Sequence, residues 1–125
     1  MSGAQEILGL AADLGKAPAV VARVLFDVYK ESGDAFAKDW ADNARETSGT
    51  HGKYYPDSIT SESRLAFGIE IETGPDSSRK QGRMGRGFEF GSKNQPPHLD
   101  GARALPMAEQ RLLRAADVAI GFALP

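Results

Sequence analysis

A long stretch of helical periodicity over residues 18–45 is the feature that most limits how this chain can fold. Apolar side chains recur there at intervals of three and four, and charged side chains fill much of the rest. The apolar set is Val21, Val24, Leu25, Val28, Phe36, Trp40 and Ala44. This spacing predicts one amphipathic helix, with Phe36 and Trp40 in the core. Ser32-Gly33-Asp34 predicts a break or a kink within it, because glycine costs a helix about 1 kcal/mol relative to alanine.

A second periodicity, of two residues, indicates β-structure in the middle of the chain. Residues 65–73 alternate between an apolar set and a set that contains two glutamates; the apolar set is Leu65, Phe67, Ile69, Ile71 and Thr73. This pattern predicts a strand with one buried face. A shorter, polar strand is expected over residues 58–63. A third is expected over residues 86–91, where Phe88 and Phe90 would share one face and Glu89 would occupy the other.

Two more helices and a loop complete the predicted order. Ile7, Leu8, Ala11 and Leu14 indicate a short helix over residues 4–14, and the apolar stripe after Pro106 indicates a helix over residues 106–122. Residues 75–85 read as a long flexible loop. With 125 residues, one domain is expected. The predicted class is α+β, with a small antiparallel sheet packed against the long helix of the N-terminal half and the C-terminal helix.

The overall composition narrows the classes of partner. Charged residues make up 26% of the chain and the formal net charge is −2, so no strong overall field attracts nucleic acid or membrane. The chain contains no cysteine, which excludes disulfides and thiolate metal sites. No apolar run approaches the roughly 20 residues of a membrane span. The first ten residues lack the pattern of a signal peptide, so neither a leader nor a membrane role is expected.

The motifs of common active sites are absent from the sequence. The glycines Gly82, Gly85, Gly87 and Gly91 fit no dinucleotide or phosphate-loop spacing, and no G-x-S-x-G elbow occurs. One enzymatic alternative stays open: a small metal-dependent hydrolase or nuclease that uses His98, Asp100 and Glu89. It requires these side chains to converge within about 2.0–2.6 Å of one cation. The commoner role for His98 is that of a hydrogen-bonding corner residue.

Two charged groups suggest contact surfaces. Glu70 and Glu72 lie on one face of the predicted strand, where a solvated or subunit-facing role is commoner than acid–base catalysis. Four cations fall within eight residues of the flexible loop: Arg79, Lys80, Arg83 and Arg86. The loop is interpreted as solvated, as an arm to a neighbouring subunit, or as a nucleic-acid contact. The last alternative is weakened because no aromatic residue interleaves with the cations in sequence.

The order of motifs between Ala44 and Ala104 resembles a family of structural proteins. A loop HGKYYPDSI (51–59), a strand FGIEIETGP (67–75), the segment GFEFGSKNQPPH (87–98) and a terminal helix after ARAL follow one another. This order is similar to that of the small tail-completion or head–tail joining proteins of long-tailed bacteriophages (siphoviruses), also called minor tail or neck components. The matching residues are Glu89, Phe90, Gly91, Ser92, Pro96, Pro97, His98 and Ala104.

The resemblance implies a structural role without a catalytic site, cofactor or metal. It implies a homo-hexameric ring in the virion neck, assembled in the cytoplasm of the bacterial host. The ring would join the head connector or stopper to the tail tube and let DNA pass. The hypothetical interface residues are Glu70, Glu72, Arg79, Lys80, Arg83, Arg86 and Glu89, and the structural corner is Gly91, Ser92, Pro96, Pro97 and His98. Tyr54, Tyr55 or Leu99 would meet the next ring. Deletion of residues 77–83 is expected to preserve the monomer's fold and impair joining.

Overall fold

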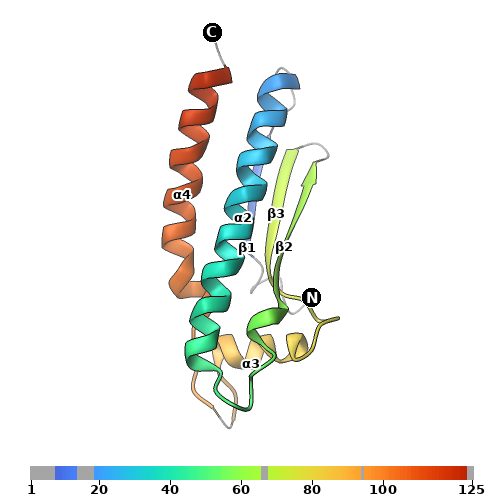
Figure 1. Cartoon of the computed structure of the whole chain (residues 1–125), viewed down its shortest axis with the longest axis vertical. Coiled ribbons are helices and arrows are strands. Elements are labelled where there is room, and N and C mark those ends of the chain that lie inside the picture. Colours follow the sequence, from blue (N-terminus) through green and yellow to red (C-terminus); the bar gives the residue numbers. More distant parts are fainter. Residues whose placement is uncertain (1–7, 14–18, 66–67, 94, 124–125) are drawn as a thin grey trace.

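The computed structural model describes residues 8–13, 19–65, 68–93 and 95–123. Its elements are β1 (Leu8–Asp13), α2 (Ala19–Thr47), η1 (Pro56–Ser58), β2 (Ile59–Leu65), β3 (Gly68–Pro75), η2 (Gly82–Met84), α3 (Gly85–Phe90) and α4 (Asp100–Ala123), where η1 and η2 are 3₁₀ helices. Two long helices lie side by side along the length of the molecule, the strands flank them, and α3 crosses below (Figure 1). The predicted α+β class is therefore confirmed.

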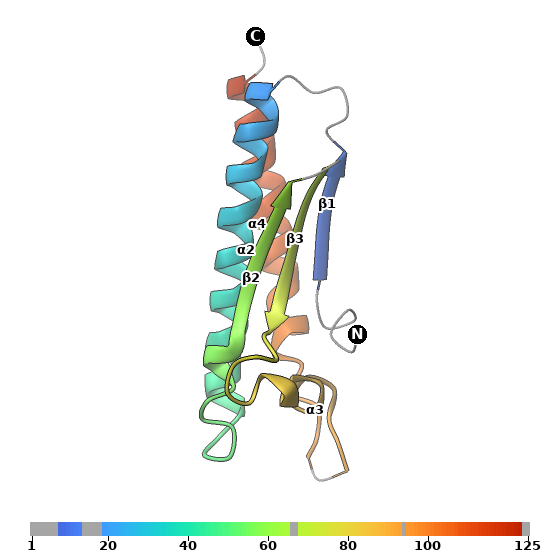
Figure 2. The same cartoon turned by 90° about the vertical axis from the view of Figure 1, so that its right-hand side faces the viewer.

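The three strands form one antiparallel sheet in the order β1-β3-β2. Viewed from its open side, the sheet lies in front of the helices (Figure 2). Ile69, Ile71 and Thr73 of β3 are buried, and the alternate residues Glu70 and Glu72 belong to the open face. The period of two in the sequence thus separates the covered face from the open one.

The covered face of the sheet packs against α2. Ile69 and Ile71 form a cluster with Val21 and Leu25, and the partly buried Ala116 and Ile120 of α4 pack against this cluster. Gly33 lies at the closest approach: a Cβ atom there would come within 2.4 Å of Ser61 Oγ and 2.5 Å of Ile71 Cγ2. Of the predicted break or kink at Ser32-Gly33-Asp34, the break is wrong, because α2 is continuous from Ala19 to Thr47. The glycine makes room for the sheet.

A second cluster fills the lower half of the molecule, around Trp40. Phe36, Trp40, Tyr55 and Phe88 are each no more than 2% exposed. Small side chains join them, namely Ala37, Ala41 and Ala44 of α2 and Ala104 and Ala108 of α4. Alanines on both helices permit close packing of the two backbones. The predicted core role of Phe36 and Trp40 is confirmed.

The predicted helix over residues 4–14 is wrong where it can be compared. Leu8–Asp13 form β1, whose register with β3 sets Leu10 opposite Ile71; residues 4–7 and 14 lie outside the described residues. The apolar spacing of so short a segment fits a helix but does not require one. The backbone of β3 offers hydrogen-bond partners on its second edge, and pairing with it satisfies the polar groups of both segments.

The predicted strand over residues 86–91 is also wrong, because Gly85–Phe90 form the helix α3. Phe88 and Glu89 are buried at 2% and 3%, whereas Phe90 is 45% exposed. The alternation of two phenylalanines therefore did not mark one apolar face. Gly91, with φ of 86°, ends the helix in a conformation that favours glycine, and its amide donates to the Gly87 carbonyl.

The C-terminal helix begins six residues earlier than predicted. It runs from Asp100 to Ala123 and contains Pro106. A proline within a helix lacks one amide donor and is usually unfavourable. Here the first turn is held from outside by Glu89, so the helix is established before Pro106 is reached. The expected strands over residues 58–63 and 65–73 correspond to β2 and β3, and Leu65 ends β2 instead of opening the next strand. Phe67 lies outside the described residues.

Candidate assembly surfaces and the joint at the lower end

The lower end of the molecule, built by residues 48–58, 76–93 and 95–99, contains most of the residues that sequence analysis selected. Glu89 of α3 is central to it. Its two carboxyl oxygens accept hydrogen bonds from the amides of Gly101 and Ala102, each at 2.9 Å. These amides belong to the first turn of α4, where helix donors lack intrahelical partners and a negative group is favoured. Glu89 therefore caps α4 from a distant segment.

Asp100 ties the start of α4 to the end of α2. Its side chain is fully buried and accepts hydrogen bonds from Thr47 Oγ1 at 2.8 and 3.0 Å and from Arg103 Nη2 at 2.9 Å. Its backbone carbonyl accepts one from Asn43 Nδ2 at 2.9 Å. Because a buried carboxyl group needs such partners, this network fixes how the two long helices meet.

The contacts of Glu89 and Asp100 form one part of a joint between α2, α3 and α4, and aromatic rings form the other part. Phe88 stacks on Tyr55 with ring centroids 4.4 Å apart, and the His98 ring lies 5.8 Å from Phe88. The His98 amide also donates to the Phe88 carbonyl at 2.9 Å. Gly52 and Gly101 let the chain approach Phe88 and Trp40, since a Cβ atom at either position would lie within 2.7 Å of a ring atom. Residues 52–59, 87–93 and 95–101 thus form one packed unit.

The predicted structural corner lies between α3 and α4. Ser92 and Gln95 form an isolated bridge, while Pro96 and Pro97 are exposed. A Cβ atom at Gly91 would come within 2.9 Å of the Pro97 nitrogen, so the turn is tight. Leu99, with φ of 55°, adopts a conformation that is costly for a residue with a side chain. The hydrogen bond from its amide to the Glu89 carbonyl holds it there.

The enzymatic alternative required His98, Asp100 and Glu89 to converge. His98 Nδ1 lies 4.0 Å from Asp100 Oδ2, but both oxygens of Glu89 are engaged with α4 amides and Asp100 is engaged with Thr47 and Arg103. Among the residues that the structure describes, no group of three or more His, Cys, Asp or Glu side chains is placed to hold a metal ion.

The open face of the sheet carries the predicted interface glutamates. Arg64 Nη2 lies 2.9 Å from Glu70 Oε1 and 2.5 Å from Glu72 Oε1, and its Nη1 atom lies 3.9 Å from Glu62. Hydrogen bonds to Glu72 and Glu70 raise the pKa of the Arg64 guanidinium. Three carboxylates thus surround one cation on an exposed surface. Glu89, predicted to face the same neighbour, is instead buried and lies on α3.

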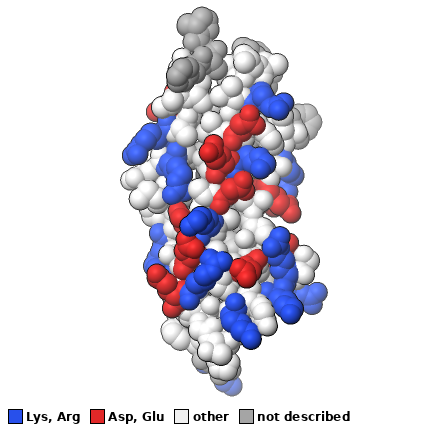
Figure 3. All heavy atoms as spheres, in the orientation of Figure 1, with Lys and Arg blue, Asp and Glu red and all other residues white. Residues whose placement is uncertain are grey.

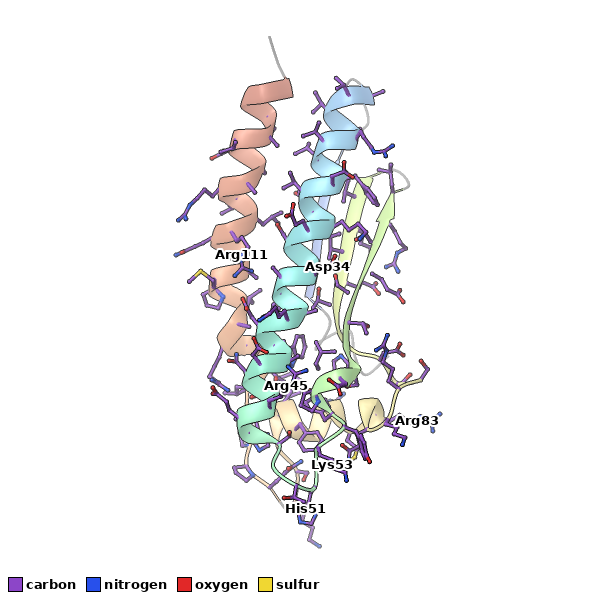
Figure 4. The ribbon with its side chains drawn as sticks, in the orientation of Figure 1. Asp34, Arg45, His51, Lys53, Arg83 and Arg111 are labelled. Atoms are coloured by element: carbon purple, nitrogen blue, oxygen red, sulfur yellow. The ribbon has the colours of Figure 1, made fainter. Side chains whose placement is uncertain are left out.

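A different surface lies where α2 and α4 meet away from the sheet. An open groove of about 480 Å³ is lined by Val28, Met107, Gln110, Arg111, Arg114, Ala115, Val118 and Ala119. Arg111 closes the lower part of the seam through an ion pair with Asp39 at 2.9 Å and is labelled in Figure 4. Met107 and Val118 are 56% and 58% exposed. Sequence periodicity did not single out this apolar surface.

The cationic loop is folded onto its neighbours. Gln81 donates from Nε2 to the His51 carbonyl at 2.6 Å and accepts from the Tyr54 amide at 2.8 Å. Its φ of 62° is held by these two contacts. A Cβ atom at Gly82 would lie 1.8 Å from the Asp76 carbonyl oxygen. The loop of residues 75–85 is therefore built from turns and η2, and deletion of residues 77–83 would remove Gln81, which braces the neighbouring loop.

The same fold places an aromatic ring among the cations. The ammonium groups of Lys53 and Lys80 lie 5.0 and 4.7 Å from the centroid of Tyr54, which is 41% exposed. Arg83 lies at the right of the lower end in Figure 4, and blue side chains gather in the same region of Figure 3. Of the residues expected to meet a neighbouring ring, Tyr54 and Leu99 are exposed, whereas Tyr55 is fully buried.

Comparison of the chain with models of protein families, with curated proteins and with solved structures gave no match. The structure itself describes an α+β chain whose two long helices are fixed to one another at the lower end. Within the part of the chain that the structure describes, no helix is long and apolar enough to cross a membrane.

Proposed function

We propose that this chain is a structural subunit of a bacteriophage neck, a tail-completion or head–tail joining protein that acts as a ring between the head connector and the tail tube. The proposal places it in the virion, assembled in the cytoplasm of the bacterial host, with genomic DNA passing through the lumen. Its partners are further copies of itself, in a ring of six by resemblance, together with the connector or stopper and tail-tube proteins. It assigns the chain no cofactor and no catalytic residue.

The observation that carries the proposal is the arrangement of the sheet edges. Among the described residues, β3 is paired on both sides, while β1 and β2 each pair with β3 alone. An edge strand has backbone groups available for pairing with another chain. Because β1 and β2 are different strands, contact between the β1 edge of one copy and the β2 edge of the next is heterologous. Repeated heterologous contacts close into a ring when the rotation permits.

The joint at the lower end supports the same role. Two neighbouring residues of the resembling segment, Phe88 and Glu89, form a buried brace: Glu89 caps α4 and Phe88 stacks on Tyr55. A subunit that carries load between two assemblies benefits from a rigid connection between its helices. These residues act by holding α2, α3 and α4 together, and the outward surfaces are left for contact with partners.

The first experiment tests joining directly. The gene is deleted from its phage, unjoined heads and tails are isolated, and the purified protein is added back. Negative-stain microscopy should then show joined particles, and rings should be visible with the protein alone or with the connector. Heads and tails that join equally well without the protein would refute the proposed function.

A proline scan tests the β2 edge. In an antiparallel pair, neighbouring residues point their amides alternately toward the partner strand and away from it. One of Glu62→Pro and Ser63→Pro therefore removes only an outward-pointing amide and should keep the circular dichroism spectrum of the wild type. That variant should fail to form rings. Ser77→Pro, in the exposed loop, is the control. Normal rings from a folded edge variant would rule out the β2 edge as the contact.

A further inference from the structure

We propose that the cationic surface at the lower end is a contact site for the phosphate backbone of duplex nucleic acid, with Lys53, Arg79, Lys80 and Arg83 as its cations and Tyr54 as the group that organises two of them. The biological setting of this inference, DNA in the lumen of a neck ring, rests on the proposed function. The binding itself is a property of the isolated chain.

Charge is distributed unevenly along the molecule. Residues 48–58 and 76–99 hold six of the lysines and arginines and three of the aspartates and glutamates, and the rest of the chain holds nine against fourteen. Of the three acids at the lower end, Glu89 is buried beneath α4 and Asp57 is paired with Arg45. Although the net charge of the whole chain is near zero, the lower end is therefore positively charged and the rest of the chain is negatively charged. Such a surface attracts phosphate through the release of counterions.

The tertiary structure supplies the aromatic residue that the loop lacks in sequence. Tyr54 belongs to the loop between α2 and η1, yet Lys80 lies over its ring as closely as its own neighbour Lys53 does. The two hydrogen bonds of Gln81 bring these loops together. Two ammonium groups are thereby held at one exposed ring, at 5.0 and 4.7 Å from its centroid.

The same geometry favours backbone contact over base recognition. Side chains that stack on bases need a free aromatic face, whereas the ring of Tyr54 is engaged by two lysines. Within the described residues Lys53, Lys80 and Arg83 have no acidic partner, and Arg79 has only Asp76 at 3.8 Å. These four cations can meet phosphates without first breaking a short ion pair. The contact is therefore expected to be independent of sequence and sensitive to salt.

The test is an anisotropy titration of a fluorescein-labelled 20-base-pair duplex of mixed sequence, at several NaCl concentrations from about 25 mM upward. Four contacts predict a slope of about −3 to −4 in a plot of log K against log salt, since each neutralised phosphate contributes about −0.9. The double variant Lys53→Gln/Lys80→Gln should weaken binding at least tenfold at the lowest salt and reduce the slope by about 2.

A matched control removes two cations from elsewhere. Arg23→Gln/Lys38→Gln changes two exposed residues of α2, whose side chains are 80% and 74% exposed, and should leave the slope unchanged. Tyr54→Leu should weaken binding about two- to fivefold because the lysines lose their shared ring, and Tyr54→Phe should keep wild-type affinity. Comparison of Tyr54→Leu with Tyr54→Phe separates the organising role of the aromatic ring from a general effect of loop packing.

Three results would overturn the inference: no duplex binding at the lowest salt, an unchanged slope in Lys53→Gln/Lys80→Gln, or an equal loss in the α2 control. If duplex binding is absent while these lysine substitutions still prevent head–tail joining, the surface meets an acidic protein instead. Failure of this inference does not change the result expected from the joining experiment. Conversely, duplex binding by a protein that joins no particles would remove the proposed function and keep the site.

Discussion

Substitution of Glu89 offers the sharpest test of the joint between α3 and α4. Its carboxyl oxygens accept hydrogen bonds from the amides of Gly101 and Ala102 at 2.9 Å, and its side chain is 3% exposed. Glu89→Ala leaves two donors at a helix N-terminus without this acceptor. A hydrogen bond to a charged group contributes about 1.5–3 kcal/mol. Taking the lower value for both, we expect Glu89→Ala to lower the free energy of unfolding by about 3 kcal/mol.

The expected loss is large on the scale of a small domain. With an unfolding entropy of about 2.1 cal/mol/K per residue, a chain of 125 residues loses roughly 4 °C of Tm for each kcal/mol, so Glu89→Ala should melt about 11 °C lower. Urea denaturation followed by circular dichroism gives the free energy, and a thermal scan gives the Tm. Glu89→Gln keeps one acceptor oxygen and should lose about half as much.

The control is Glu109→Ala, which removes an exposed glutamate from α4 itself and should change the free energy of unfolding by no more than about 0.5 kcal/mol. A Glu89→Ala variant as stable as this control would show that the capping contact contributes nothing. The reasoning about the joint would then be wrong, because Glu89→Ala removes both acceptor oxygens from the first turn of α4.

Two further predictions concern the sheet and the loop. Gly33→Ala should lower the free energy of unfolding, measured with urea, by about 1–3 kcal/mol, because its Cβ would overlap Ile71. The control Gly121→Ala, with no atom within 4 Å of the added Cβ, should raise it by roughly 0.5–1 kcal/mol. Equal effects of the two substitutions would refute the close approach of Gly33 to the sheet. Hydrogen bonds from the Ser78 hydroxyl and amide hold the pKa of Asp76 below its ordinary value, so its stabilising contribution is present above about pH 4 and is lost as the pH falls through the lowered pKa. An NMR titration of Ser78→Ala should move that pKa toward the ordinary value, and an unshifted titration would contradict the assignment.

Sequence patterns correctly located the elements whose periodicity extends over many residues, and they assigned two short elements to the wrong class. The periodicity of residues 18–45 runs over many turns, so α2 and its core residues Phe36 and Trp40 could be read directly. The alternation of Ile69, Ile71 and Thr73 marked the covered face of β3. Segments of about six residues, by contrast, satisfy either period, which is why residues 8–13 and 86–90 were assigned to the wrong class.

The candidate sites show the same division. Sequence reasoning selected the cations of the loop and the corner residues of 91–98, but it placed Glu89 on an outward face. Nothing near Glu89 in sequence indicates its partners, which lie twelve and thirteen residues away at the start of α4. The local signal that could have located the start of α4 is Asp100, an acidic residue in its first turn.

The sequence alone determined the fold class, the long helix, the covered face of β3 and the near-neutral total charge, because these depend on local periodicity and on composition. Only the tertiary structure decided that Leu8–Asp13 join the sheet, that Glu89 caps α4, and that Lys53 and Lys80 both contact the Tyr54 ring. Each of these depends on a backbone or side-chain partner from a distant segment. The free energy of satisfying buried polar groups, and not the intrinsic preference of the segment, selects such contacts.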